Sequence, residues 1–144
     1  MDEHYIHAQI CYPKVLDFGG EAAMGTDEAL RNVSVESGAG WVPYILEALE
    51  YMSVEASLPY EVPPSEVFRR QIYACTFFER RNLVDTVRQV GADNILFETD
   101  FPHPSCLFPD SLDYAVDALA ELMWEERFKN FSGNAAKLYN IDIA

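Results

Sequence analysis

Acidic side chains and one histidine gather where two apolar segments of the chain end. The segment NILFETDFPHP, residues 94–104, passes from an apolar run to Asp100 and His103, and the segment VSVES, residues 33–37, carries Glu36 near its end. Two carboxylates and an imidazole are ligands that Zn²⁺ and other divalent ions accept. Such an ion lowers the pKa of bound water toward about 7, so these residue types point to metal-activated water chemistry.

Strand geometry gives a reason to expect these side chains to converge. Residues two apart on a strand share a face, so Glu98 and Asp100 point the same way, and Glu36 shares a face with Ser34. If the two strands are neighbours in a parallel sheet, Glu36 and Asp100 meet at one rim, with His103 just beyond the strand. Ligand sites of parallel sheets lie at this rim, beyond the carboxyl ends of the strands.

The same residues also have structural interpretations. An acid at a strand end commonly caps the loop or helix that follows, and Glu98 would also fit a pairing with a cation inside the sheet. His103 lies between two prolines, where a histidine is often a plain loop residue. His4 and His7 are three apart on a predicted strand, so they face opposite ways and do not form a metal pair.

Short strands alternate with helices along the chain, which predicts βαβ units and a mostly parallel α/β sheet. Pro43 suits the first turn of a helix, Gly91 suits a helix end, and Asp110 with Asp113 has the spacing of a capping box. The expected strands cover residues 4–12, 33–37, 71–78 and 94–100, and the expected helices cover residues 28–32, 41–56, 64–71, 80–91, 111–123 and 134–139.

Length, charge and cysteine content bound the function. The chain has 144 residues, for which one domain is the default. Its net charge of −14 argues against nucleic acid and against an anionic membrane surface as partners. Cys11, Cys75 and Cys106 form no spaced metal pair and favour a reducing, cytoplasmic location. The sequence has no apolar run of membrane-spanning length and no signal-peptide pattern.

Four segments, taken together and in order, resemble one family. They are similar to the C-terminal part of the amidohydrolase-related proteins, the metal-dependent branch that includes aminocarboxymuconate-semialdehyde decarboxylase and related aromatic-acid decarboxylases. The N-terminal residues resemble a different place in that family, the second strand and its loop. We therefore expect a single, internally shortened domain over residues 1–144, with 1–32 second-strand-like and 33–144 a C-terminal barrel segment. The four segments are residues 33–50, 68–79, 94–104 and 131–142.

The resemblance implies a (β/α)₈ barrel with its site at the carboxyl ends of the strands. The implied activity is hydrolysis or non-oxidative decarboxylation of a small carboxylic or aromatic acid by metal-activated water, with Zn²⁺ as the first choice of metal. Asp100 matches the last-strand aspartate that binds the metal or exchanges protons with metal-bound water. Glu36 stands where many members carry a histidine, and with His103 it would line the substrate pocket.

The chain also departs from the family pattern. A barrel of this kind needs about 250 residues, and the metal-binding pair of the first strand and the histidine of the middle strands have no counterpart here. About four of the eight strand–helix units are expected, whose open edges predict a homodimer that completes the sheet. Two interpretations stay open: a metal-dependent enzyme, or a catalytically inactive remnant without metal that acts as a small-molecule binding or assembly module.

Overall fold

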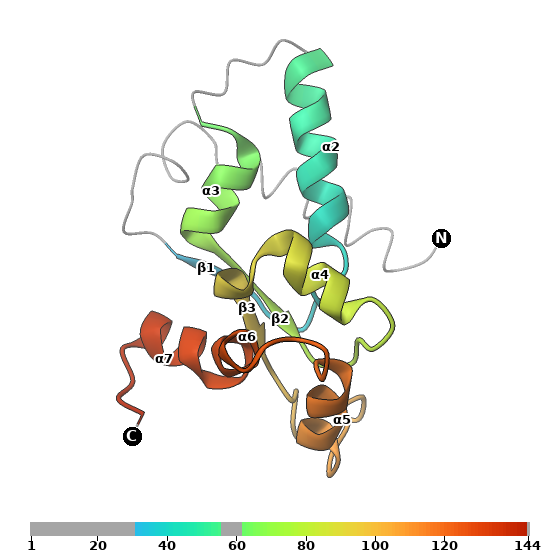
Figure 1. Ribbon diagram of the computed structural model, residues 1–144. Helices are drawn as coiled ribbons and strands as arrows, with labels where there is room; N and C mark the ends of the chain where they lie inside the picture. Colours follow the sequence, from blue (N-terminus) through green and yellow to red (C-terminus); the bar gives the residue numbers. More distant parts are fainter. Residues whose placement is uncertain (1–30, 56–61, 144) are drawn as a thin grey trace.

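The computed structural model describes residues 31–55 and 62–143 of the chain. Its centre is a three-stranded parallel sheet in the order β1 (Asn32–Ser34), β2 (Ile72–Thr76) and β3 (Ile95–Phe97), as Figure 1 shows. The expected parallel α/β architecture is therefore confirmed. Among the described residues the sheet has three strands, and the strand expected at residues 4–12 lies outside them.

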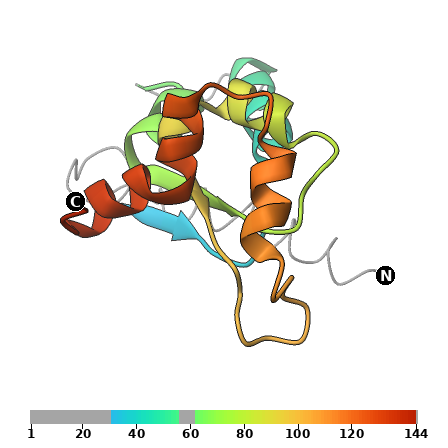
Figure 2. The same cartoon turned by 60° about the horizontal axis from the view of Figure 1, so that its bottom comes forward.

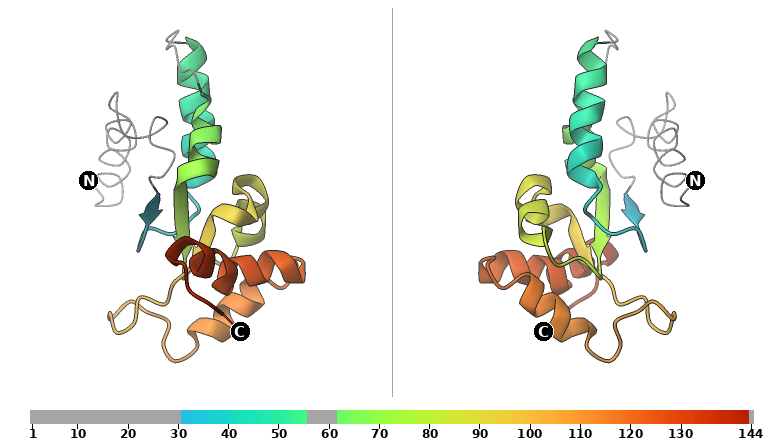
Figure 3. Two further views of the ribbon diagram at one scale, coloured as in Figure 1. Left: turned by 90° about the vertical axis from the view of Figure 1, so that its left-hand side faces the viewer. Right: turned by 90° about the vertical axis from the view of Figure 1, so that its right-hand side faces the viewer.

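Helices surround this sheet unequally. Figure 3 shows α4 to α7 together on one side, whereas the loop between β3 and α5 projects to the other side. Figure 2 shows the same loop extending well beyond the sheet. No helix within residues 31–55 and 62–143 has the length and apolar character needed to cross a bilayer. The helices are α2 (Val42–Glu55), α3 (Pro64–Gln71), α4 (Leu83–Val90), α5 (Ser111–Ala118), α6 (Trp124–Phe128) and α7 (Asn134–Tyr139), with a 3₁₀ turn η1 (Ala92–Asn94) and a π-helical turn η2 (Lys129–Gly133).

The core lies between the sheet and its helices. Val42 of α2, Val87 of α4 and Ile95 of β3 have no exposed surface and belong to one cluster. Burying each of these side chains stabilises the fold by about 1.5–3 kcal/mol. In α4 the buried positions Leu83, Val87 and Val90 recur at helical spacing, which explains why this segment folds as a helix against the sheet.

Two buried asparagines connect the helices to the strands. The Asn94 side chain donates to the carbonyl of Ile72 at 2.8 Å, and the Asn134 side chain donates to the carbonyls of Ala92 and Ile95, both at 2.7 Å. Buried carbonyl oxygens without donors would destabilise the fold, so each amide satisfies acceptors at the start of a strand. Asn134 therefore fixes α7 against the amino end of β3.

Several predicted helix boundaries were wrong. The helix expected at 111–123 ends at Ala118, and Asp110 makes no side-chain capping bond. At Asp110 φ is −92° and ψ is 12°, whereas a capping residue normally has extended backbone. The Glu126 carboxylate instead accepts a hydrogen bond from the Met123 amide at 2.9 Å, and this contact begins α6, a helix not predicted from the sequence.

The loop after β1 is held by a carboxylate from the loop after β2. Glu79 accepts hydrogen bonds from the amides of Ala39 and Phe77, the latter at 3.2 Å. Gly38, the residue before Ala39, has φ of 65°, and the Trp41 ring donates to its carbonyl at 2.8 Å. A Cβ atom at Gly38 would lie 2.5 Å from the Glu79 carboxylate, so this position needs glycine for both conformation and space.

Cys75 lies near the carboxyl end of the central strand and is buried. Burial, together with the nearby carboxylates of Glu98 and Glu79, raises the pKa of its thiol to about 12. The thiol therefore stays neutral at physiological pH. Because its pKa is raised on folding, the stability that it contributes is present below about pH 9 and is lost as the pH rises through about 12.

We expect Gly38→Ala to lower the free energy of unfolding by about 1–3 kcal/mol, because alanine resists a positive φ and its Cβ would meet Glu79. Gly40→Ala is the matched control, since nothing lies within 4 Å of a Cβ there. Urea denaturation of both variants measures the difference. Equal effects of the two substitutions would contradict the account of this loop.

We expect iodoacetamide at pH 8 to modify Cys106 while Cys75 stays unmodified in the folded protein, because the thiolate is the reactive form. Peptide mapping by mass spectrometry measures both positions in one sample. Raising the pH toward 12, or adding urea, should expose Cys75 to the reagent. Rapid labelling of Cys75 at pH 8 without unfolding would show that its environment is wrongly assigned.

Candidate functional site

Glu36, Asp100 and His103 come together beyond the carboxyl ends of the strands. Each offers one potential ligand atom, and these atoms all lie within 4.8 Å of one another. Asp100 Oδ2 lies 3.1 Å from His103 Nδ1. Glu36 and His103 are exposed, whereas the Asp100 side chain is only 18% exposed. The three candidate residues from the sequence therefore share one place in the structure.

The route by which they meet differs from the expected one. Strands β1 and β3 are not neighbours, because β2 lies between them, and they end at Ser34 and Phe97. The side chains of Glu36 and Asp100 therefore do not follow strand alternation. Both residues lie in loops with left-handed backbone, at φ of 58° and 55°.

A left-handed backbone is unfavourable for residues other than glycine, by about 1–2 kcal/mol. Such conformations persist where surrounding contacts hold them, and they gather at functional sites. Two of them, at Glu36 and Asp100, stand in the same small cluster. In this cluster, contacts with surrounding residues therefore outweigh the ordinary backbone preference of two residues.

A tight turn places His103 beside Asp100. The His103 amide donates to the Asp100 carbonyl at 2.8 Å, which folds the chain back. Ser105 Oγ lies 2.7 Å from His103 Nδ1 and donates to Asp100 Oδ2 at 3.3 Å. In a Ser–His–Asp triad, serine and aspartate contact different ring nitrogens, whereas here both contact Nδ1. The geometry therefore does not support a nucleophilic serine.

Glu98 joins the two outer loops of the site. Its Oε1 accepts a hydrogen bond from the Glu36 amide at 2.7 Å, and the Cys75 thiol is a second hydrogen-bonding partner. Burial raises the pKa of Glu98, and the charges of Asp100 and Glu36 add to this rise, while the bonds from Glu36 and Cys75 oppose it. The sequence suggested a cation as its partner and did not predict this contact.

Glu79 is a second residue whose role was not predicted. Like Glu98 and Asp100, Glu79 is an acid that follows an apolar strand, so the same sequence pattern could have identified it. Neither Glu79 nor Glu98 is part of the three-residue cluster, because both direct their carboxylates at backbone amides. Acids that follow these strands thus divide into those that hold loops, Glu79 and Glu98, and those that belong to the cluster, Glu36 and Asp100.

The cluster has the donor chemistry of a divalent-metal site. One imidazole and two carboxylates suit Zn²⁺ or Mn²⁺, whose ligand atoms lie about 2.0–2.2 Å from the ion and hence at most about 4.4 Å apart. The upper separation of 4.8 Å is a few tenths of an ångström wider. Because Glu36 and His103 are exposed, side-chain rotation can supply this contraction. The residues fit such an ion.

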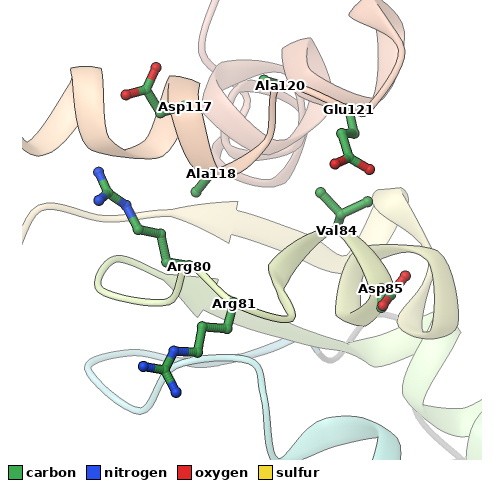
Figure 4. A pocket seen from close by; sticks show the side chains of 8 residues that line it. All are labelled: Arg80, Arg81, Val84, Asp85, Asp117, Ala118, Ala120 and Glu121. Carbon is green, nitrogen blue, oxygen red and sulfur yellow. The ribbon is translucent and has the colours of Figure 1, made fainter.

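A hollow of about 390 Å³ lies elsewhere, between α4 and the end of α5 (Figure 4). Its lining residues include two arginines and three acids but none of the residues of the cluster. Because its charges are mixed and it lies on the helical side, it does not mark the same site. Its lining consists of Arg80, Arg81, Val84, Asp85, Asp117, Ala118, Ala120 and Glu121.

Comparison with characterised proteins agrees with the sequence resemblance. The chain is 27% identical to a γ-resorcylate decarboxylase from a Rhizobium strain over 114 residues, which is 72% of this chain and 32% of that protein. A second γ-resorcylate decarboxylase, from Rhizobium radiobacter, is also 27% identical and is covered to 32%. This chain thus spans about a third of the length of the curated relatives that it matches.

Solved structures show the same fold. An amidohydrolase from Mycobacterium avium subsp. paratuberculosis superposes with a TM-score of 0.75 at 22% identity, over 88% of this chain and 32% of that one. A dihydroxybenzoic acid decarboxylase from a Polaromonas species, with bound manganese and the inhibitor 2-nitroresorcinol, gives 0.56 at 24% identity, over 72% and 32%. The expected partial (β/α)₈ barrel is confirmed by these likenesses.

The family assignment rests on nearly the whole chain. The amidohydrolase family model matches residues 7–141, which include all the described strands and helices. That match also includes Glu36, Asp100 and His103. The chain therefore belongs to the amidohydrolase family.

Proposed function

We propose that this chain provides part of a divalent-metal centre of the amidohydrolase type, with hydrolysis or non-oxidative decarboxylation of a small aromatic carboxylic acid as the reaction. The observation that carries the proposal is the meeting of Glu36, Asp100 and His103 within 4.8 Å. The decarboxylase relatives support the reaction class, and the manganese in one related structure supports a metal.

In this proposal Asp100 is the central ligand, because it is the least exposed of the three and already contacts His103. Glu36 and His103 complete the donor set or contact the substrate at the open side of the site. When bound, a divalent ion polarises a carboxylate and lowers the pKa of a water ligand toward about 7. Zn²⁺ was expected from the sequence, while a carboxylate-rich donor set also suits Mn²⁺.

The His103–Asp100–Ser105 contacts give the chain a means of handling a proton. Ser105 donates to Asp100 and touches His103 Nδ1, so a proton at the imidazole lies close to the Asp100 carboxylate. Asp100 thereby acts as the acid or base of the proposed reaction. If the ion is held without half-exposed His103, this imidazole lies at the mouth of the site, where it can orient the carboxylate of the substrate.

A binding module without catalysis is the second candidate function. It is favoured by the share of the relatives that this chain covers, 32%, because a complete barrel supplies further ligands and walls. If the protein is an enzyme, additional polypeptide must supply those ligands and walls. The homodimer expected from the sequence is one source of them and stays a prediction.

We expect the purified protein to bind one Mn²⁺ per chain, and Asp100→Asn to weaken that binding at least about tenfold, since even outer-shell changes cost about 10–100-fold. Glu47→Gln is the matched control, because it removes one exposed carboxylate on α2, away from the cluster. Electron paramagnetic resonance of free Mn²⁺ during a titration measures the affinities.

Equal affinities of the three proteins would show that Mn²⁺ associates only with the negative surface and would refute the metal centre. Release of carbon dioxide from γ-resorcylate by the Mn²⁺-loaded protein then separates the two functions. Turnover that Asp100→Asn abolishes supports the enzyme. Specific Mn²⁺ binding without turnover of γ-resorcylate and similar aromatic acids supports the binding module.

A further inference from the structure

Glu36 lies beside Asp100 and His103 with a left-handed backbone conformation. The residue follows β1 by two positions, and its φ of 58° turns the chain away from the extended path of the strand. The segment after it, Ser37 to Gly40, contains two glycines and has little preference of its own. A contact from outside this loop holds the Glu36 amide.

The Glu98 carboxylate supplies that contact. Its Oε1 accepts from the Glu36 amide at 2.7 Å, across a separation of 62 residues. The Glu98 backbone is itself fixed, because its amide donates to the Thr76 carbonyl at 3.0 Å as an extension of the sheet. The side chain thus starts from a rigid strand end and reaches across β2 to the loop of β1.

A hydrogen bond to a carboxylate is stronger than one between neutral groups, so it helps to offset the cost of the left-handed conformation. The other supports of the loop, the bond from the Ala39 amide to Glu79 and the contact of Ser37 Oγ with Ser34 Oγ at 2.7 Å, do not engage the Glu36 amide. Loss of the Glu98 bond would therefore release Glu36 while the rest of the loop stays attached.

We propose that Glu98 is a positioning residue: its carboxylate holds the Glu36 backbone so that the Glu36 side chain faces Asp100 and His103. This inference rests on the proposed metal centre, and it adds a residue that acts through Glu36 and not as a ligand. In this inference, the Glu98 contact fixes the loop after β1 in its binding position in the metal-free protein. Outer-shell contacts of this kind change metal affinity by about 10–100-fold.

The test compares Glu98→Gln, which keeps an oxygen that accepts the Glu36 amide, with Glu98→Leu, which does not. Amide hydrogen exchange is measured by NMR in the metal-free proteins. We expect protection of the Glu36 amide to persist in Glu98→Gln and to be lost in Glu98→Leu. The amide of residue 98, bonded to Thr76, and that of Ala39, bonded to Glu79, are internal controls that show the sheet and the loop intact.

Mn²⁺ titration of the same proteins gives the second readout. We expect Glu98→Leu to weaken binding by about 10–100-fold and Glu98→Gln by less than about threefold. Equal weakening in both variants, with the Glu36 amide still protected, would mean that Glu98 acts only by its charge and would overturn the inference. Unchanged Mn²⁺ affinity in Glu98→Leu would overturn it as well.

The two proposals fail in distinguishable ways. If wild-type protein binds no specific Mn²⁺, the metal centre is wrong, while protection of the Glu36 amide still reports on the Glu98 contact. If wild-type protein binds Mn²⁺ through Asp100 and the Glu36 amide exchanges equally in all variants, the metal centre stands and the positioning role of Glu98 is wrong.

Discussion

The hydrogen bond between the Glu98 carboxylate and the Glu36 amide joins two strands that do not pair. Strands β1 and β3 are separated by β2, so no backbone ladder runs directly between them. This contact and the bond from Ala39 to Glu79 connect the carboxyl ends of all three strands. The arrangement of Glu36, Asp100 and His103 depends on these tertiary contacts more than on secondary structure.

The cost of this arrangement is a concentration of negative charge. Glu36, Glu98 and Asp100 lie close enough that the charges of the other two raise the pKa of Glu98 in addition to its burial. Two carboxylates about 4 Å apart repel each other by up to about 4 kcal/mol at the effective dielectric of a protein surface. One histidine offsets only part of this. A divalent cation at this place would offset the repulsion between the carboxylates.

Much of the architecture could be predicted from the alternation of apolar segments, because parallel βαβ units leave a regular signal. The helix boundaries were harder to predict from the sequence. Helix α6 and the π-helical turn before α7 lie in a segment that contains Asn130 and Gly133, and its helical pattern is weak. The single helix expected at 111–123 gives no sign of the break at Ala118. Such endings depend on packing that one sequence does not display.

The candidate residues could be named from the sequence, yet the reason for their meeting could not. Strand alternation cannot explain Asp100 or Glu36, because left-handed conformations at non-glycine residues carry no clear sequence signal. Glu98 and Glu79 were recognisable as strand-end acids, but their backbone partners lie 62 and 40 residues away. Contacts between a side chain and a distant amide appear only once the loops are placed.

The central claim is that Glu36, Asp100 and His103 bind one divalent ion. Anomalous diffraction from crystals grown with Mn²⁺ tests it most directly, because the signal locates the ion without reference to activity. We expect one strong peak about 2.0–2.3 Å from oxygens of Glu36 and Asp100 and from a nitrogen of His103. A peak only at other acids, such as Asp117 and Glu121 beside α5, or no peak at all, would contradict it.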